Sequence, residues 1–264
     1  MGDGFGDGFP TDGEVPVHRV RIDDFEMDTT TVTVADFAAF VTDTGYRTTA
    51  QQAGTSAVFT ALVDDASAIS GSVPAAPWWS IVSGADWAHP FGPDSGTDEQ
   101  TDHPVVHVSW HDAQAYCRWA GRSLPSEAQW EFAARGGHAG RRYPWGDSAR
   151  DRATCNIFVG EFPDHPAGSI GTVAVESYEP NDFGLWQMVG NVWEWCEDRF
   201  DPRYYARGES LNPRGPERGS ARVLRGGSYL CHDSYCNRYR NAARSHNPPA
   251  STAGNVGFRT VRER

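Results

Sequence analysis

The abundance of tryptophan, glycine and proline is the feature that most limits how this chain can fold. Among 264 residues there are 10 Trp, 28 Gly and 17 Pro. Glycine and proline weaken or interrupt helices and strands, and large indole rings can fill a core that short elements leave loosely packed. The composition therefore predicts an irregular, turn-rich fold held by aromatic clusters. One large domain over residues 1–264 is the simplest organisation for this length.

The charge and hydropathy of the chain exclude several classes of function. A net charge of −12 argues against binding to nucleic acid, because phosphate recognition needs a positive field. No apolar stretch approaches the roughly 18 residues of a membrane span, and no signal peptide is recognisable at Met1. We therefore expect a cytoplasmic monomer, in a compartment where disulfides are usually transient or catalytic.

Two periodic segments precede residue 46, and few occur over residues 46–102. Alternating apolar and polar residues predict a half-buried strand at 15–22. Apolar residues at helical spacing predict a helix over 33–41, with Thr33 as a candidate N-cap and Gly45 as its end. Residues 46–102 combine prolines with tryptophans, and are expected to form a long loop region packed by rings.

The middle of the chain carries clearer helix signals. Residues 103–110 resemble a strand that runs into a helix cap. Ser109 and Asp112 have the spacing of a capping box, and they predict a helix over 111–120 that ends at Gly121.

A second helix is predicted directly afterwards. Ser126 and Gln129 form a better capping box for a helix over 126–135, with Gly136 and Gly137 as its stop. Beyond this helix the sequence is rich in Gly, Trp and Arg, which predicts loops and short strands.

The cysteines point to sulfur chemistry. The chain has five, and two of them, Cys231 and Cys236, stand in one short loop after a glycine pair. Thiolates select Cu(I), zinc or iron–sulfur clusters, and a low-pKa thiol is a nucleophile or a redox partner. At this spacing two side chains diverge on a straight strand or helix, so a joint role requires a bend at 232–234. The other cysteines, Cys117, Cys155 and Cys196, are expected to be buried and inert.

Motifs along nearly the whole chain identify a family. They are APWW at 76–79, HPVVHVSW at 103–110, WAGRSLPSEAQWE at 119–131, YPWGD at 143–147, GLW at 184–186, VGNVWEW at 189–195, RGGSYLCHDSYC from 225 and NVGFR at 255–259. With these motifs the chain resembles the formylglycine-generating enzymes, also called sulfatase-modifying factors. Most of the motifs mark a broad superfamily, whereas GGSYLCHDSYC at 226–236 looks like the enzymes themselves.

The resemblance implies a fold and an activity. The implied fold class is α+β, a single domain that is a variant of the C-type-lectin-like fold with little regular secondary structure. The implied reaction is oxidation of a cysteine in a Cys-x-Pro-x-Arg motif of an unfolded sulfatase to Cα-formylglycine. It consumes O2, needs a thiol reductant and uses Cu(I) as the redox metal.

The resemblance also implies a set of site residues. Two thiolates suit a two-coordinate Cu(I) centre, whereas structural zinc would need about four ligands. A structural or redox disulfide between the same cysteines remains an alternative, and Trp193 taken alone could be a core residue. The residues placed in the active site are Cys231, Cys236, Ser228, His232, Tyr235, Trp193 and Asn255, with Cys231 and Cys236 as the copper ligands.

Calcium is the second implied metal, since hard cations prefer oxygen ligands. One family site would use backbone oxygens of Gly190 and Val192, the carboxylate of Glu194, and Gln187 where the family commonly has Asn. The other begins at Asn156 and Ile157. The loop 163–169 that follows is shorter than in the family, so we expect that site to be altered or empty, with Asp164 as a possible substitute ligand.

Two alternative functions remain open. An iron-dependent C–S bond-forming synthase would need a His-rich metal site, usually with a partner domain carrying His-x3-His-x-Glu, and no such pattern is found. A lectin-like binding module could have kept the fold and lost the activity, although retention of both loop thiols argues against it. A groove for an extended peptide could be lined by Trp78, Trp79 and Arg238, while core packing is equally expected for the two tryptophans.

Overall fold

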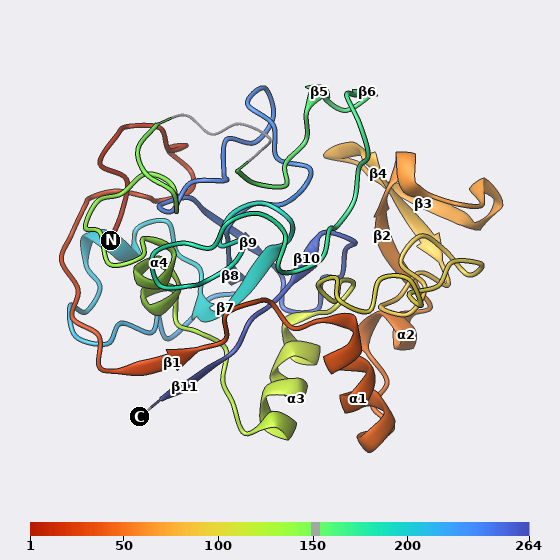
Figure 1. Cartoon of the computed structure of the whole chain (residues 1–264), viewed down its shortest axis with the longest axis horizontal. Coiled ribbons are helices and arrows are strands. Elements are labelled where there is room, and N and C mark those ends of the chain that lie inside the picture. The colour runs from red at the N-terminus through yellow and green to blue at the C-terminus, as the bar shows by residue number, and fades with distance from the viewer. Residues whose placement is uncertain (149–153, 264) are drawn as a thin grey trace.

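Short helices and short strands combine in an α+β fold (Figure 1). The computed structural model describes residues 1–148 and 154–263. Long irregular segments join its elements, as the glycine and proline content predicts. The helices are α1 (Val34–Thr44), α2 (Thr49–Ala53), α3 (Trp110–Ala120) and α4 (Glu127–Ala134), and 3₁₀ turns occupy Thr60–Leu62, Ala66–Ala68 and Tyr204–Ala206.

Local capping signals set the ends of α1 and α3. The Thr33 side chain accepts a hydrogen bond from the backbone N–H of Asp36, and Gly45 ends α1 in a left-handed conformation with φ of 65°. At the start of α3, Ser109 and Asp112 form the same reciprocal pair. Side chains at these positions satisfy N–H groups that lack a partner within the helix. Both predicted helices are therefore confirmed.

The helix α4 is also confirmed, and it carries charge into the core. Ser126 and Gln129 form its capping box, and the helix ends before Gly136. Its residues Glu127 and Glu131 are buried, and both form ion pairs with Arg225 from a neighbouring strand. Buried carboxylates need such partners, so these ion pairs couple α4 to the sheet beneath it.

A four-stranded sheet in the order β10–β7–β8–β9 lies at the centre of the molecule. β10 runs parallel to β7, and the other neighbours are antiparallel. Because Val256 of β10 lies opposite Trp193 of β7, the segment before β10 ends beside the start of β7. The strands are β7 (Trp193–Arg199), β8 (Arg222–Arg225), β9 (Arg244–Asn247) and β10 (Val256–Gly257).

A second sheet corrects the expectation of a long loop at 46–102. This sheet has the order β2–β4–β3, and it follows the short helix α2. Its strands are β2 (Thr55–Phe59), β3 (Ile69–Val73) and β4 (Ala76–Ser83). The prolines misled the prediction because Pro77 lies where the β3–β4 register shifts, and such irregular positions tolerate a missing N–H donor.

Two predicted strands are wrong. Residues 15–22 are irregular apart from a bridge between Arg21 and Leu211. Residues 103–110 make a bridge between Pro104 and Thr33, but they do not form a strand. The reason at 103–110 is His107, whose φ of 58° is left-handed and breaks an extended conformation.

Aromatic rings fill the core, as the composition predicts. Trp130 and Trp195 are fully buried. Tyr116 on α3 lies between Phe37 on α1, at 6.1 Å between ring centroids, and Phe258 after β10, at 5.4 Å. These contacts hold α1 and α3 side by side below the central sheet (Figure 1).

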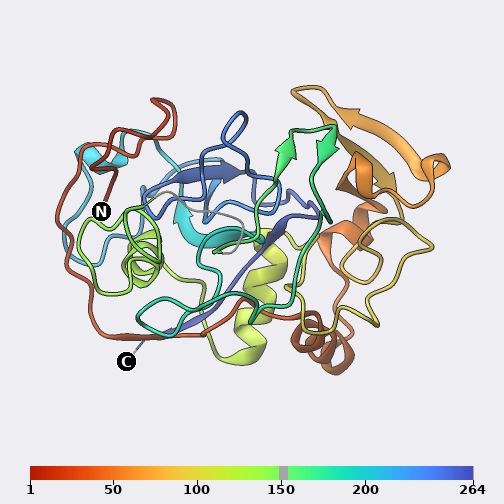
Figure 2. The same ribbon diagram turned by 45° about the horizontal axis from the view of Figure 1, so that its top comes forward.

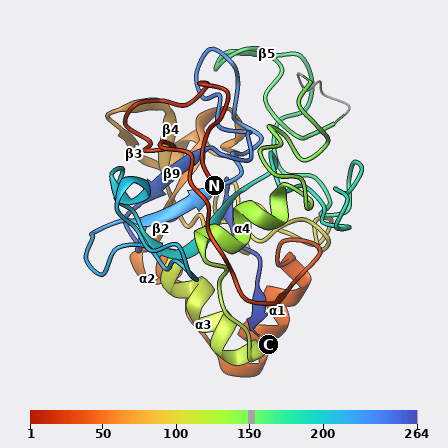
Figure 3. The ribbon, with the colours of Figure 1, turned by 90° about the vertical axis from the view of Figure 1, so that its left-hand side faces the viewer.

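The remaining short strands pair in two places. β1 (Phe25–Met27) pairs antiparallel with β11 (Val261–Glu263), which brings the two ends of the described chain to one side, where the N-terminal segment passes over α4 (Figure 3). β5 (Gly160–Glu161) and β6 (His165–Pro166) form a hairpin beside the β3–β4 hairpin (Figure 2). Phe162, between β5 and β6, contacts Trp78 of β4 edge-to-face at 5.2 Å.

Candidate active site

The two loop thiols converge. The Sγ atoms of Cys231 and Cys236 lie 2.9 Å apart, and the two residues are 1% and 4% exposed. Both are free cysteines. The bend expected at 232–234 is present, since the backbone N–H groups of Tyr235 and Cys236 both donate to the His232 carbonyl, at 3.0 and 2.7 Å. The loop therefore presents two sulfur atoms at one point.

Gly227 makes this convergence possible. Its φ of 72° lies in the left-handed region, and a Cβ there would lie 3.0 Å from Sγ of Cys231 and 2.9 Å from the carbonyl oxygen of Arg238. Real Cβ atoms rarely approach so closely, and glycine has no penalty for this backbone conformation. The glycine before the thiol loop is therefore required by the close approach of Cys231.

The environment of the two sulfurs is asymmetric. Burial raises the pKa of Cys231 well above its usual range. The hydrogen bond from Cys231 lowers the pKa of Cys236 to about 7, with a further contribution from the charge of Arg238. Arg238 is held in place by Asp12, at 2.5 and 3.1 Å, and lies over the ring of Phe9 at 4.4 Å. Of the two thiols, Cys236 is therefore the one that loses its proton more readily.

Ser228 and Asn255 lie in the same cleft as the two thiols. The side-chain amide of Asn255 donates to Oγ of Ser228 at 2.9 Å, and the backbone N–H of Leu230 donates to the same oxygen at 3.3 Å. The carbonyl of Asn255 accepts from the Trp193 N–H at 2.8 Å. Because Oγ of Ser228 already accepts two hydrogen bonds, its own proton is available for donation.

A cleft of about 350 Å³ connects these groups. It brings together six of the seven predicted active-site residues, and His232 is the exception among the described residues. The His232 ring instead lies 2.8 Å from Oγ of Ser234 and faces Phe158. Of the predicted groove residues, Trp79 and Arg238 line the cleft, together with Ser245, Asn247, Thr252 and Ala253.

Tyr235 forms one rim of the cleft. It is 40% exposed, and its ring stacks on Phe162 at 4.5 Å with an interplanar angle of 2°. Trp78 contacts the same ring edge-to-face at 4.8 Å. Phe162 was not predicted from the sequence, because nothing in its local pattern shows that the β5–β6 hairpin folds back onto the thiol loop.

The residues predicted for calcium lie together in part. Asn191 donates its N–H to the Asn156 carbonyl at 2.8 Å, and a Cβ at Gly190 would lie 2.5 Å from the same oxygen. Oε1 of Gln187 is buried without a hydrogen-bond partner, so this oxygen is free to act as a ligand to a cation.

Glu194 fits the calcium prediction less well. Its carboxylate accepts from Arg259 at 2.7 and 2.8 Å and from Nε1 of Trp130 at 2.8 Å. Its charge is therefore already balanced. Asp164 is exposed between β5 and β6. Across residues 1–148 and 154–263, no group of three or more His, Cys, Asp or Glu side chains is placed to hold a metal ion.

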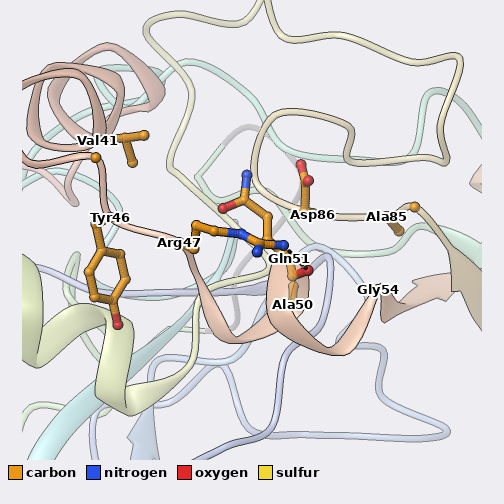
Figure 4. Close-up of a pocket in the computed structure, with 10 residues that line it drawn as sticks. Val41, Tyr46, Arg47, Ala50, Gln51, Gly54, Ala85 and Asp86 are labelled. Carbon is orange, nitrogen blue, oxygen red and sulfur yellow. Dashed lines mark hydrogen bonds between the residues drawn. The ribbon is translucent and has the colours of Figure 1, made fainter.

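A second cavity, of about 460 Å³, lies between the end of α1, α2 and residues 84–86 (Figure 4). Its polar side chains are Tyr46, Arg47, Gln51 and Asp86. Arg47 donates to the Gln51 carbonyl at 3.3 Å, and Asp86 accepts from the N–H groups of Ala88 and His89. Since these groups are satisfied locally and no thiol lines it, the cavity offers no comparable chemistry.

Comparison with known proteins finds a matching family model and several similar proteins. The family model for the sulfatase-modifying factor enzyme 1-like domain matches residues 1–264. The formylglycine-generating enzyme of Streptomyces coelicolor is 56% identical over 269 residues, which cover 100% of this chain and 86% of that protein. The formylglycine-generating enzyme of Thermomonospora curvata is 50% identical, with 96% of this chain and 86% of that protein covered.

A solved structure bears on the fold. PvdO from Pseudomonas aeruginosa superimposes with a TM-score of 0.71 at 22% sequence identity, over 100% of this chain and 90% of that chain. The superposition confirms the predicted fold class. Among the described residues, no helix combines the length and hydrophobicity that crossing a bilayer requires.

Proposed function

The chain belongs to the sulfatase-modifying factor enzyme family, and from this premise we propose that it oxidises a cysteine of an unfolded sulfatase to Cα-formylglycine. One observation carries the proposal: two free thiols meet at 2.9 Å in a cleft of about 350 Å³. We expect the cysteine to lie in a Cys-x-Pro-x-Arg motif, and the protein to act as a monomer in the cytoplasm.

The overall reaction balances with O2 and two reducing thiols. The thiol-bearing carbon of the substrate cysteine becomes an aldehyde, and its sulfur leaves as hydrogen sulfide. In the net balance one oxygen atom ends in the aldehyde and one in water. The two external thiols supply two electrons and end as a disulfide.

The donor set of the site fits Cu(I). Cys231 and Cys236 supply two soft sulfur donors that already converge, and the lowered pKa of Cys236 eases its deprotonation. A bound copper ion would supply the one-electron chemistry that reaction with O2 requires. Arg238 balances the negative charge of the pair from within the cleft.

The protein groups around the thiols bind and orient the substrate. An extended peptide would lie against Trp79 and Tyr235 on one side and the segment 251–256 on the other. Its cysteine would then reach the thiol pair. Ser228, whose oxygen is held by Asn255, would donate its proton toward the reacting sulfur or oxygen.

We also propose calcium as a structural ion near Gln187. Its unpartnered Oε1 and the backbone carbonyls of Gly190 and Val192 are the oxygen donors, and Glu194 contributes only if its bonds to Arg259 rearrange. Asn156 and Ile157 would begin the separate second calcium site. Adding calcium to chelator-treated protein should raise its unfolding temperature, and Gln187→Leu should remove that increase. No increase in the unaltered protein would contradict the calcium proposal.

Mass spectrometry of a Cys-x-Pro-x-Arg peptide tests the proposed activity. With copper, a thiol reductant and air, the protein should convert the peptide thiol to an aldehyde, whereas Cys231→Ser and Cys236→Ser should not. An unchanged peptide with the unaltered protein would favour a binding module that lacks the activity. Full conversion by either variant would remove that cysteine from the mechanism.

A further inference from the structure

His107 occupies an unusual position behind the cleft. The residue is fully buried and non-glycine, yet its φ is 58°. Left-handed backbone at such a residue costs free energy, and it persists where the surrounding structure holds it. The contacts of His107 show what this conformation achieves.

Both nitrogens of the imidazole are bonded. Nε2 donates to the Pro90 carbonyl at 2.9 Å, because a carbonyl oxygen can only accept. Nδ1 lies 2.8 Å from Oγ of Ser56. Burial lowers the pKa of His107 to about 4, so the ring is neutral near pH 7 and carries its single proton on Nε2.

Ser56 passes this contact on to the cleft. Its hydroxyl also lies 2.8 Å from Oγ1 of Thr252, and Thr252 lines the cleft. Because Nδ1 of the neutral ring accepts and the Ser56 hydroxyl has one proton, Ser56 shares that proton between Nδ1 of His107 and Oγ1 of Thr252, and so lies between the buried ring and a cleft residue.

Residues 252–255 form the wall of the cleft around Thr252, and their backbone is hydrogen-bonded to His107 and to β2. The His107 N–H donates to the Ala253 carbonyl at 3.0 Å, and the Gly254 N–H donates to the Ala57 carbonyl at 2.9 Å. A Cβ at Gly254 would lie 3.1 Å from Nε2 of His107, so the wall and the ring are in close contact.

We propose that His107 is a positioning residue that holds the cleft wall 252–255 in place for the substrate peptide, through Ser56 and Thr252 and through the Ala253 carbonyl. The proposal rests on the proposed function, because the occupant of the cleft is the sulfatase peptide. It assigns a role to a residue that touches neither the thiols nor the cleft.

The network of His107, Ser56 and Thr252 should affect peptide binding and leave the chemical step unchanged. Asn255, at the end of the wall, is fixed independently by the Trp193 N–H and keeps its hydrogen bond to Ser228. Loss of the Ser56 link should therefore loosen Thr252 without moving the thiols or Ser228. Peptide binding should weaken while the rate of the bound complex is retained.

Three variants test this prediction: Ser56→Ala, Thr252→Val and the double variant. Each single variant should raise KM for the peptide about three- to tenfold, the effect of one lost hydrogen bond, with kcat within about twofold. The double variant should resemble the singles, because both changes break the same link. Thr252→Ser, which keeps the hydroxyl, should restore KM. Tyr46→Phe is the control, since it removes a hydrogen bond to Asp112 away from the cleft.

Hydrogen exchange provides a readout that does not depend on turnover. Ser56→Ala should speed amide exchange in peptides covering 252–256, and Tyr46→Phe should not. If the unaltered protein neither binds nor oxidises the peptide, the proposed function fails, and this exchange measurement still decides whether the wall is held by the network. Unchanged KM and unchanged exchange in Ser56→Ala, or additive effects in the double variant, would overturn the positioning role.

Discussion

Asp12 forms an ion pair with Arg238, 226 positions further along the chain, at 2.5 Å. The contact ties the N-terminal loop to a residue two positions after Cys236, and Arg238 lines the cleft. Because Asp12 is buried, the ion pair holds the guanidinium group of Arg238 in a fixed position.

Asp12→Asn should therefore impair both stability and turnover. Leaving the guanidinium of Arg238 without its carboxylate should lower the free energy of unfolding by about 1–3 kcal/mol. The kcat/KM for the peptide should fall about tenfold or more. This fall corresponds to a loss of transition-state stabilisation in the same energy range as the loss of unfolding free energy. Urea unfolding and peptide oxidation measure the two effects. Glu263→Gln, which removes an exposed pair with Arg214, should alter neither, and equal kcat/KM in both variants would contradict the role of Asp12.

The second prediction compares two left-handed glycines. Gly227→Ala places a Cβ 3.0 Å from Sγ of Cys231, whereas a Cβ at Gly121 would meet no atom within 4 Å. Gly121→Ala should cost about 1–2 kcal/mol for the backbone conformation alone and leave peptide oxidation intact. Gly227→Ala should lose more stability and most of the activity. Thermal unfolding with activity assays at a permissive temperature distinguishes them, and an active Gly227→Ala protein would show that the thiol loop tolerates displacement.

The third prediction concerns the buried charges beneath the sheet. Glu127 accepts hydrogen bonds from Arg225, Arg244 and Tyr205, at 2.6–3.1 Å. Burial opposes ionisation of Glu127, but the charges of Arg244 and Arg225 lower its pKa. Glu127→Gln leaves two buried guanidinium groups poorly compensated and should destabilise the protein by about 3–5 kcal/mol. Denaturant unfolding measures the loss, and a change as small as that of exposed Arg207→Gln would refute a structural role for the network.

The fourth prediction is a pH dependence with a defined sign. Burial, and then the charge of Glu127, raise the pKa of Asp198 to about 8. The folded state therefore keeps a proton that the unfolded state releases, so this contribution to stability is present below the ordinary aspartate pKa of 3.8 and is lost as pH rises toward 8.

Asp198→Asn should consequently unfold at a higher temperature than the unaltered protein at pH 8, by a margin that shrinks as pH falls to 4. Asn retains an oxygen to accept the Glu127 N–H, now 2.8 Å from Asp198. Asp24→Asn, at an exposed position, controls for the change in net charge. A margin that is constant with pH would show that Asp198 is ionised in the folded protein.

Sequence alone predicted what depends on near neighbours. The helix α3 follows from Ser109, Asp112 and Gly121, because capping is settled within one turn of the helix. The thiol loop is equally local, since the bend at 232–234 joins Cys231 to Cys236. These features were found correctly for the same reason.

Contacts between distant segments were not predictable in this way. The strand β4 was missed because Pro77 disguises it, although its partner β3 is its immediate neighbour in the chain. The left-handed backbone of His107 interrupts the segment that was predicted to be a strand, and the N–H of His107 is hydrogen-bonded to the cleft wall at Ala253. Asp12 and Phe162 shape the site from loops whose local patterns carry no sign of it.

Copper binding tests the central claim most directly. Competition with a chromophoric Cu(I) chelator should show about one tightly held Cu(I) per chain in the unaltered protein. Cys231→Ala and Cys236→Ala should each abolish that binding, whereas Cys117→Ala, at a buried thiol elsewhere in the core, should retain it. Equal copper retention by the unaltered protein and the Cys231→Ala, Cys236→Ala double variant would contradict the account.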